Sequence, residues 1–482
     1  MITNKFKYRN GLAAGLMFAL GLAGGWGTDA RAAATITILN ADGAGEGFND
    51  PTPAAPVGGN SGTTLGQQRL TAFQAAANIW GATLTSNVPI IIRANFDPLT
   101  CTASSAVLGS AGGTFVFLNF SGAPLADTWY PFALANKITN TDLDPGEPQI
   151  IARFNANLGQ PGCLTGTFFY LGLDNNHGSN VDLVTVLLHE FGHGLGFQTF
   201  TSGSTGAQLL DVPSVWDHFL FDNTANKLWK DMTNAERAAS AINPRELVWT
   251  GANVTNRLPS VLSPGTPRLT ISGPMAGMAV GNHLVGAASF GPPLGPIPVA
   301  GQLMPVVDQT NGTGLACDPL NARNALAVKN NIALVDRGVC GFTVKAANVQ
   351  AAGAIGMVVA DNIAGSPPPG LGGTDPAIVI PAVRISQADG VALKAQLKSR
   401  SRTASGVIAN LNVNTAQFAG ADTLGGALMF TPNPFQGGSS VSHWDTIAFP
   451  NQLMEPAING DLTHSVVFPQ DLTFELLKDI GW

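Results

Sequence analysis

The spacing of hydrophobic residues along the first 200 positions predicts several strands and two helices. Segments with the β-branched or alternating pattern of strands lie at residues 34–40, 88–96, 113–120 and 150–158. Apolar residues that recur every three or four positions predict amphipathic helices over residues 65–84 and 184–195. Helices packed on a sheet in this order indicate a domain of the α+β class.

The second predicted helix has recognisable ends. Ser179 and Asp182 stand three apart just before the apolar run, which is the spacing of a capping box. Gly196 follows the last apolar position, and glycine commonly ends helices because it adopts backbone angles that other residues avoid. The helix is therefore expected to end near Gly196.

The pattern changes from about residue 274, where the chain becomes rich in glycine and proline. Residues 331–336 and 355–361 read as buried strands, and residues 342–354 between them read as a helix. A strand, a helix and a strand in succession are typical of a small α/β unit. We therefore expect a separate domain over residues 274–410, followed by a turn-rich segment and a short final helix.

The N-terminal residues predict export from the cell. Lys5, Lys7 and Arg9 precede an apolar run of residues 11–25, and Ala30 and Ala32 then have the spacing of a cleavage site. This order is typical of a secretory signal peptide over residues 1–32. The apolar run is shorter than the roughly 20 residues that span a bilayer. We therefore expect a secreted protein, extracellular or periplasmic, that does not span the membrane.

Charge and cysteine content agree with an exported protein. The formal charge is −7 and no cluster of lysine or arginine occurs, which argues against nucleic acid and anionic membrane surfaces as partners. The four cysteines fit an oxidising compartment, and three pairings are formally possible. Their grouping favours two disulfides, Cys101 with Cys163 and Cys317 with Cys340.

The second helix carries the residues with the clearest chemistry, in the sequence HEFGH. His189 and His193 are four apart, so both imidazoles can reach one metal ion from the same helix face. Glu190 is placed beside the metal rather than on it, where it could take a proton from a zinc-bound water. This pattern predicts a zinc hydrolase in which Glu190 is the catalytic base.

A catalytic zinc site normally has three protein ligands, and the third is not adjacent in the sequence. In one large group of zinc peptidases a histidine follows the helix glycine by three positions, but here that position is Thr199. A glutamate on a following helix would be the alternative, yet the first one after Glu190 is Glu236. The remaining candidates are Asp211, Asp217, His218, His283, His443 and His464.

The helix motif and the late run SHWDTIAFPNQLMEP resemble the leishmanolysin-type metzincins. The resemblance implies that His443, in SHW, is the third zinc ligand, and that Met454, in LMEP, is the Met-turn methionine below the metal. It also implies the metzincin fold: a twisted sheet, an active-site helix and a Met-turn subdomain. Residues 33–273 and 411–482 would then form one catalytic domain in two parts.

The segment between these parts resembles a protease-associated (PA) domain. The resemblance is carried by ACDPLNA at residues 316–322, by residues 332–362 and by IPAVRISQADG at residues 380–390. It implies a non-catalytic α/β domain, in which Cys317 and Cys340 fall where such domains often have a disulfide. The PA domain would be inserted in the catalytic domain and could serve to dock a partner or substrate.

Together these features predict a secreted zinc-dependent endopeptidase that acts on proteins or peptides. By resemblance to the metzincins, the region of residues 150–158 is expected near the sheet edge that binds the substrate as an added strand. The competing hypothesis is a secreted binding protein in which the PA domain captures a partner and the zinc site is structural or vestigial. A fourth protein ligand, such as Asp211 or His218, would support that alternative.

Overall fold

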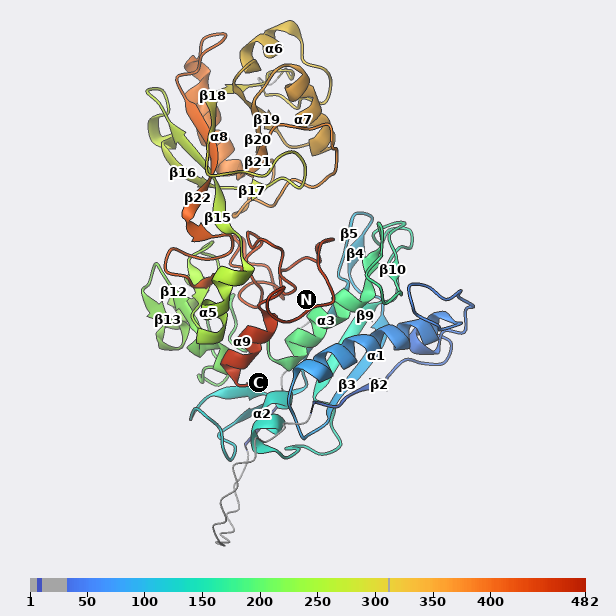
Figure 1. Cartoon of the computed structure of the whole chain (residues 1–482). Coiled ribbons are helices and arrows are strands. Elements are labelled where there is room, and N and C mark those ends of the chain that lie inside the picture. Colours follow the sequence, from blue (N-terminus) through green and yellow to red (C-terminus); the bar gives the residue numbers. More distant parts are fainter. Residues whose placement is uncertain (1–6, 11–32, 311–312) are drawn as a thin grey trace.

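The computed structural model describes residues 7–10, 33–310 and 313–482, which form two lobes (Figure 1). The first lobe comprises residues 33–263 and 419–482, and the inserted lobe comprises residues 264–418. The predicted signal peptide lies outside the described residues except for β1 (Lys7–Asn10), which pairs in parallel with β7 (Phe115–Leu118). No helix in the described ranges is both long and apolar enough to cross a membrane.

The first lobe is built on a four-stranded sheet covered by two helices. Its strands, in spatial order, are β2 (Ile36–Asn40), β3 (Ile90–Asp97), β9 (Ile150–Asn155) and β6 (Gly109–Gly113). The first three run parallel, and β6 is antiparallel to β9. The helices are α1 (Leu65–Thr83) and α3 (Leu183–Leu195). Phe73 of α1 packs on Phe154 of β9 and on Phe191 of α3, with ring centroids 4.9 and 6.0 Å apart, so both helices cover the same face.

The open edge of this sheet is a strand that the sequence pattern does not predict. The 150–158 segment supplies β9, which is paired on both sides, with β3 and with β6. The edge strand beside α3 is β6, whose sequence GSAGG has no hydrophobic alternation and therefore gave no strand signal. Residues 150–155 therefore lie next to the edge, near it as expected, and β6 provides the edge itself.

The inserted lobe contains one eight-stranded sheet. Its central strands, β18 (Val299–Pro305), β19 (Ile332–Asp336), β20 (Gly356–Ala360) and β21 (Ala382–Ile385), run parallel. The outer strands are β15 (Pro264–Ser272), β16 (Gly281–Leu284), β17 (Gly286–Ala287) and β22 (Ile408–Phe418). The helices are α6 (Ala322–Val328), α7 (Phe342–Ala351) and α8 (Gln387–Gln396). The fold is thus mixed α and β, with buried, apolar central strands as the sequence pattern predicts.

The chain enters and leaves the inserted lobe through two neighbouring strands. β15 and β22 pair antiparallel along their length, from Pro264 opposite Phe418 to Ser272 opposite Ile408. The ends of the inserted segment are therefore side by side, at the junction between the two lobes (Figure 1). Because β15 begins at residue 264 and β22 ends at residue 418, the inserted lobe begins earlier and ends later in the sequence than the expected 274–410 segment.

Segments from before and after the insertion share one core. β23 (Ala427–Leu428) adds to a small sheet of β13 (Lys227–Leu228), β12 (Leu220–Asp222) and β14 (Leu247–Trp249). Likewise, α9 (Thr473–Ile480) packs on α5 (Ala252–Val261). Two further helices of this lobe are α2 (Phe132–Thr139) and α4 (Asn234–Ser240), and β8 (Trp129–Pro131) pairs with β7. One continuous hydrophobic cluster includes residues from both parts of the chain.

Both disulfides have the pairing that the grouping of the cysteines favours: Cys101 with Cys163, and Cys317 with Cys340. The second is reinforced by Lys345, which is fully buried. The Lys345 ammonium donates to the carbonyl oxygens of Leu315 at 2.6 Å and Gly338 at 2.9 Å. Each carbonyl lies two residues from one of the cysteines, so the lysine and the disulfide join the same two segments.

Candidate metal centre

The centre begins with the local structure of α3. The helix starts after Asp182, whose carboxylate accepts a 2.7 Å hydrogen bond from the backbone N–H of Thr185. Asp182 is therefore the N-cap itself, and the expectation that Ser179 caps the helix was wrong. The helix ends at Gly196, whose φ of 123° suits glycine. Every residue of α3 is buried, which fixes the helix within the core.

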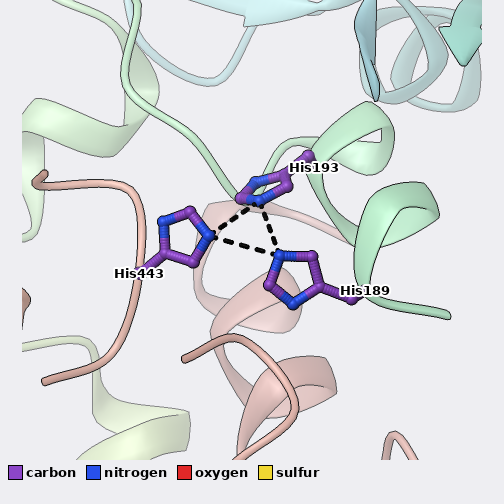
Figure 2. A group of neighbouring side chains, drawn as sticks. All are labelled: His189, His193 and His443. Atoms are coloured by element: carbon purple, nitrogen blue, oxygen red, sulfur yellow. Dashed lines mark hydrogen bonds between the residues drawn. The ribbon is translucent and has the colours of Figure 1, made fainter. Parts of the chain in front are cut away.

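Three histidines meet at the C-terminal half of this helix (Figure 2). The Nε2 atoms of His189 and His193 are 3.2 Å apart. The Nε2 atom of His443, which is 250 residues further along the chain than His193, lies 3.1 Å from that of His193 and 3.2 Å from that of His189. The structure thus brings His443 to the two histidines of the helix.

The hydrogen bonds behind the rings define their tautomers. Each Nδ1 faces a backbone carbonyl oxygen: His189 faces Leu453 at 2.8 Å, His193 faces Phe197 at 2.7 Å, and His443 faces Ser439 at 2.8 Å. A carbonyl oxygen only accepts, so each Nδ1 carries the proton and each Nε2 of a neutral ring presents a lone pair.

Burial keeps these rings neutral. It lowers the pKa of His189 to about 4 and that of His193 to about 3, and it lowers the pKa of His443 well below its ordinary value. Three lone pairs consequently converge with no proton between them, an arrangement that favours a bound cation. Nitrogen ligands about 2.0–2.1 Å from a tetrahedral zinc ion would be roughly 3.3–3.4 Å apart, close to the separations of the three Nε2 atoms. The donor set therefore fits zinc.

The side chain of Glu190 lies between the backbone of α3 and the edge strand β6. An ideal Cβ on Gly109 would lie 3.1 Å from Glu190 Cγ, so the glycine leaves the room that this side chain occupies. Burial raises the pKa of Glu190 to about 8, and a backbone hydrogen bond from Ala111 acts in the opposite direction. The carboxyl group thus lies against the edge strand β6, and its residue directly follows His189 in α3.

Met454 packs against the same helix. It is fully buried, and an ideal Cβ on Gly192 would lie 2.9 Å from its sulfur atom. The preceding residue, Leu453, provides the carbonyl that accepts from His189. The backbone N–H of Trp444 donates to the carbonyl of Met454 at 2.9 Å. The segments of His443 and Met454 are therefore bonded to each other and to α3.

The nearby candidates for a third ligand have other partners. Asp217 accepts hydrogen bonds from the hydroxyls of Thr199 at 2.8 Å and Thr201 at 2.6 Å. His218 Nε2 lies 3.0 Å from the Thr128 hydroxyl, and Asp211 is exposed. Among the described residues, only the three histidines form a group that could hold a metal.

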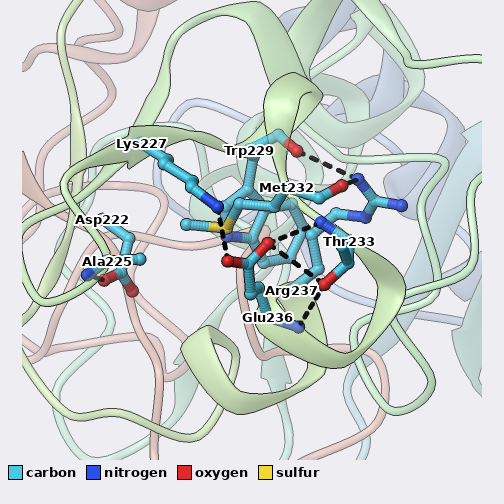
Figure 3. Close-up of polar contacts among 8 residues, drawn as sticks. All are labelled: Asp222, Ala225, Lys227, Trp229, Met232, Thr233, Glu236 and Arg237. Carbon is cyan, nitrogen blue, oxygen red and sulfur yellow. Dashed lines mark hydrogen bonds and ion pairs between the residues drawn. The ribbon is translucent and has the colours of Figure 1, made fainter.

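The side chains of the remaining candidates also contact other residues. Glu236, the first glutamate after the helix, forms a capping box with Thr233 at the start of α4 and an ion pair with Lys227 (Figure 3). His283 lies 2.8 Å from a carboxylate oxygen of Asp389. His464 lies 2.9 Å from a carboxylate oxygen of Asp182, the helix cap.

Several supporting contacts had no signal in the sequence. The carbonyl oxygens that orient the three rings belong to the backbone, so residue type does not reveal them. The indole N–H of Trp482 donates to the carbonyl of Leu195 at 2.8 Å, which satisfies one of the free carbonyls in the last turn of α3. A tryptophan so far along the chain gave no indication of this role.

Comparison with known proteins identifies one part of the chain. Residues 299–393 match the PA domain family, so the chain contains a PA domain within the inserted lobe. No curated protein matches the chain.

Solved structures resemble only part of the chain. An aminopeptidase from Aneurinibacillus sp. strain AM-1 is 23% identical, with a TM-score of 0.24 over 32% of this chain and 31% of its own. BSAP, a zinc aminopeptidase from Bacillus subtilis, is 23% identical, with a TM-score of 0.22 over 34% and 36%. A subtilisin-like protease, Apa1, from Pseudoalteromonas sp. AS-11 is 21% identical, with a TM-score of 0.20 over 31% and 34%. The chain thus spans about a third of the length of each.

Proposed function

We propose that this protein is a secreted zinc-dependent endopeptidase of the metzincin type, with His189, His193 and His443 as the zinc ligands. The convergence of three Nε2 lone pairs at 3.1–3.2 Å supports this most strongly. The resemblance of the SHW and LMEP segments to leishmanolysin-type metzincins supports the subclass. Under this proposal the first lobe, residues 33–263 and 419–482, is the catalytic domain, shorter at both breaks than the 33–273 and 411–482 expected from the sequence. Residues 1–32 are removed on export.

The chemistry would be divided between the metal and Glu190. A zinc ion bound by the three histidines would polarise the scissile carbonyl and lower the pKa of water at the site to about 7. Glu190 would accept a proton from the attacking water and pass it to the leaving amine. Burial alone raises the pKa of Glu190, and the charge of a bound zinc ion would lower it again, which favours the ionised form that a base requires.

The edge strand β6 would bind the substrate backbone. Within the described residues β6 pairs as a strand only with β9, and a guest strand could add to its other side, where the Ala111 N–H donates to Glu190. The three glycines of β6 have no side chain to obstruct such a strand, and Ala111 lies opposite Glu190. A guest strand that continued past both ends of β6 would be cut internally, which favours endopeptidase action.

Replacing Glu190 with glutamine tests the mechanism. Glu190→Gln should retain stoichiometric zinc and lose about 10²–10⁴-fold in hydrolysis of casein and of a blocked internal peptide. Glu236→Gln is the matched control, because it makes the same change at a helix cap. Hydrolysis that survives in Glu190→Gln would refute the mechanism. Cleavage confined to free N-terminal residues would instead indicate an aminopeptidase.

A further inference from the structure

The segment that carries His443 has little regular structure of its own. After β23, residues 429–455 contain no helix or strand, and one isolated bridge pairs Met429 with Trp444. Phe430 donates its N–H to the carbonyl of His443 at 2.9 Å and accepts from the N–H of Val441 at 2.8 Å. We call residues 429–455 the returning segment. Its position must come from contacts with other parts of the molecule.

One such contact comes from the loop after β20 in the inserted lobe. Ser366 and Asn433 exchange two backbone hydrogen bonds, of 2.8 Å from the Ser366 N–H and 2.6 Å from the Asn433 N–H. Asn433 lies three residues after Phe430, which is bonded to His443. The inserted lobe thus contacts the stretch of chain whose Phe430 is hydrogen-bonded to His443.

A second contact passes through Arg245 of the first lobe. Its guanidinium donates to the carbonyl of Val285, in the inserted lobe, at 3.2 Å. Its Nε lies 3.6 Å from a carboxylate oxygen of Asp445, two residues after His443. The Arg245 side chain is 9% exposed and that of Asp445 is fully buried, so solvent screens the pair little. The N–H of Asp445 also donates to the carbonyl of Leu428 at 2.9 Å.

A third contact lies where the chain enters and leaves the inserted lobe. Ser263 donates to the carbonyl of Phe449 at 2.7 Å and accepts from the N–H of Ala419 at 2.9 Å. Phe449 donates to the carbonyl of Ala419 at 3.3 Å. Phe449 lies between His443 and Met454, so the first-lobe residues that flank the inserted lobe also fix the returning segment.

We propose that the inserted lobe is part of the support of the metal centre and that Arg245 is a positioning residue for His443. Arg245 joins the inserted lobe to Asp445 and thereby fixes the backbone on which His443 stands. The inference rests on the proposed function, since it concerns the same three histidines. It adds a mechanism by which movement of the inserted lobe changes zinc affinity without any contact between that lobe and the metal.

Zinc affinity in Arg245 variants tests the inference. Arg245→Met should weaken zinc binding about 10–100-fold in competition with a chromophoric chelator, the loss typical of an outer-shell partner. Arg245→Lys, which keeps the charge, should recover part of it. Arg237→Met is the matched control: Arg237 is a buried arginine bonded to the carbonyls of Gly206, Trp229 and Met232, all outside the returning segment (Figure 3).

Two measurements keep the test decisive if Arg245→Met folds poorly. Asp445→Asn keeps the shape of the side chain and removes its charge, and it should also weaken zinc binding. The absorption bands of the Co²⁺-substituted protein should change in the Arg245 and Asp445 variants and remain constant in Arg237→Met. Wild-type zinc affinity and an unchanged Co²⁺ spectrum in the Arg245 and Asp445 variants would overturn the inference. A wild-type protein that binds no zinc would instead refute the proposed function.

Discussion

The two halves of the metal centre are built in different ways. His189, Glu190 and His193 belong to one helix, whose internal hydrogen bonds set their separation before any tertiary contact forms. His443 and Met454 belong to the returning segment, which is held by scattered hydrogen bonds from α3, β23 and the inserted lobe. The first half is therefore specified locally, whereas the second depends on the assembly of the whole molecule.

The largest expected effect comes from removing one ligand from each half. His189→Ala and His443→Ala should each weaken zinc binding by more than the roughly 100-fold that loss of an outer-shell partner can cost, because under the proposed function each removes a direct ligand. Amide hydrogen exchange should distinguish the two halves. Loss of zinc should speed exchange in residues 429–455 while α3, buried throughout, stays protected. Equal deprotection of both segments would contradict the comparison.

A smaller effect is expected where the halves touch. Gly192→Ala would place a Cβ 2.9 Å from the sulfur of Met454. Overpacking of this kind costs about 1–3 kcal/mol, which exceeds the gain of about 1 kcal/mol from alanine in a helix. Urea unfolding should therefore show net destabilisation, and adding Met454→Ala should make the Gly192→Ala change less costly. A Gly192→Ala protein more stable than wild type would contradict this, because it would show that the Met454 side chain shifts to make room at little energetic cost.

Substitutions at the N-terminus of α3 should weaken the half of the centre that this helix carries. Asp182→Ala removes the hydrogen bond to Thr185 and should lower the free energy of unfolding by about 1–2 kcal/mol. Ser179→Ala should change it by less than about 0.5 kcal/mol, since Asp182 is the N-cap. Thermal unfolding of both variants distinguishes the two caps. A larger loss in Ser179→Ala would restore the capping box expected from the spacing.

The smallest effect concerns a pair away from the metal, in the inserted lobe. The hydrogen bond to Asp389 raises the pKa of His283 above 6.5. The stability that this pair contributes is therefore fully present below pH 6.5, and it is lost as the pH rises through the raised pKa. The loss should be at most about 1 kcal/mol. His283→Gln should flatten the dependence of unfolding free energy on pH above 6.5 and leave zinc affinity unchanged.

Hydrophobic spacing predicted the elements that bury one face or one stripe. The helices α1 and α3, the strands β2, β3, β7 and β9, and the strand, helix and strand at the centre of the PA domain all lie where the sequence pattern places them. The edge strand β6 was missed because Gly, Ser and Ala contribute no alternation. Ser179 was preferred to Asp182 as the cap because spacing alone does not show which residue leads the helix.

The third histidine illustrates a different limit. From spacing alone His443 was one of six candidates, because proximity across an inserted domain has no period along the chain. Its selection came from the resemblance of the SHW and LMEP segments to a family, and the geometry then placed it 3.1 Å from His193. The contacts of Arg245 and Ser366 could not be anticipated, because they join residues of both lobes that are far apart in the sequence.

The distance of 250 residues between His193 and His443 also sets the order in which the centre can be assembled. A chain emerges from the ribosome with its N-terminus first, so α3 is complete long before the returning segment exists. Two histidines alone form an incomplete site throughout the synthesis of the inserted lobe. A nascent or truncated chain that lacks His443 therefore has no three-histidine centre. The complete centre can form in the cell only after the whole insertion and His443 have been translated.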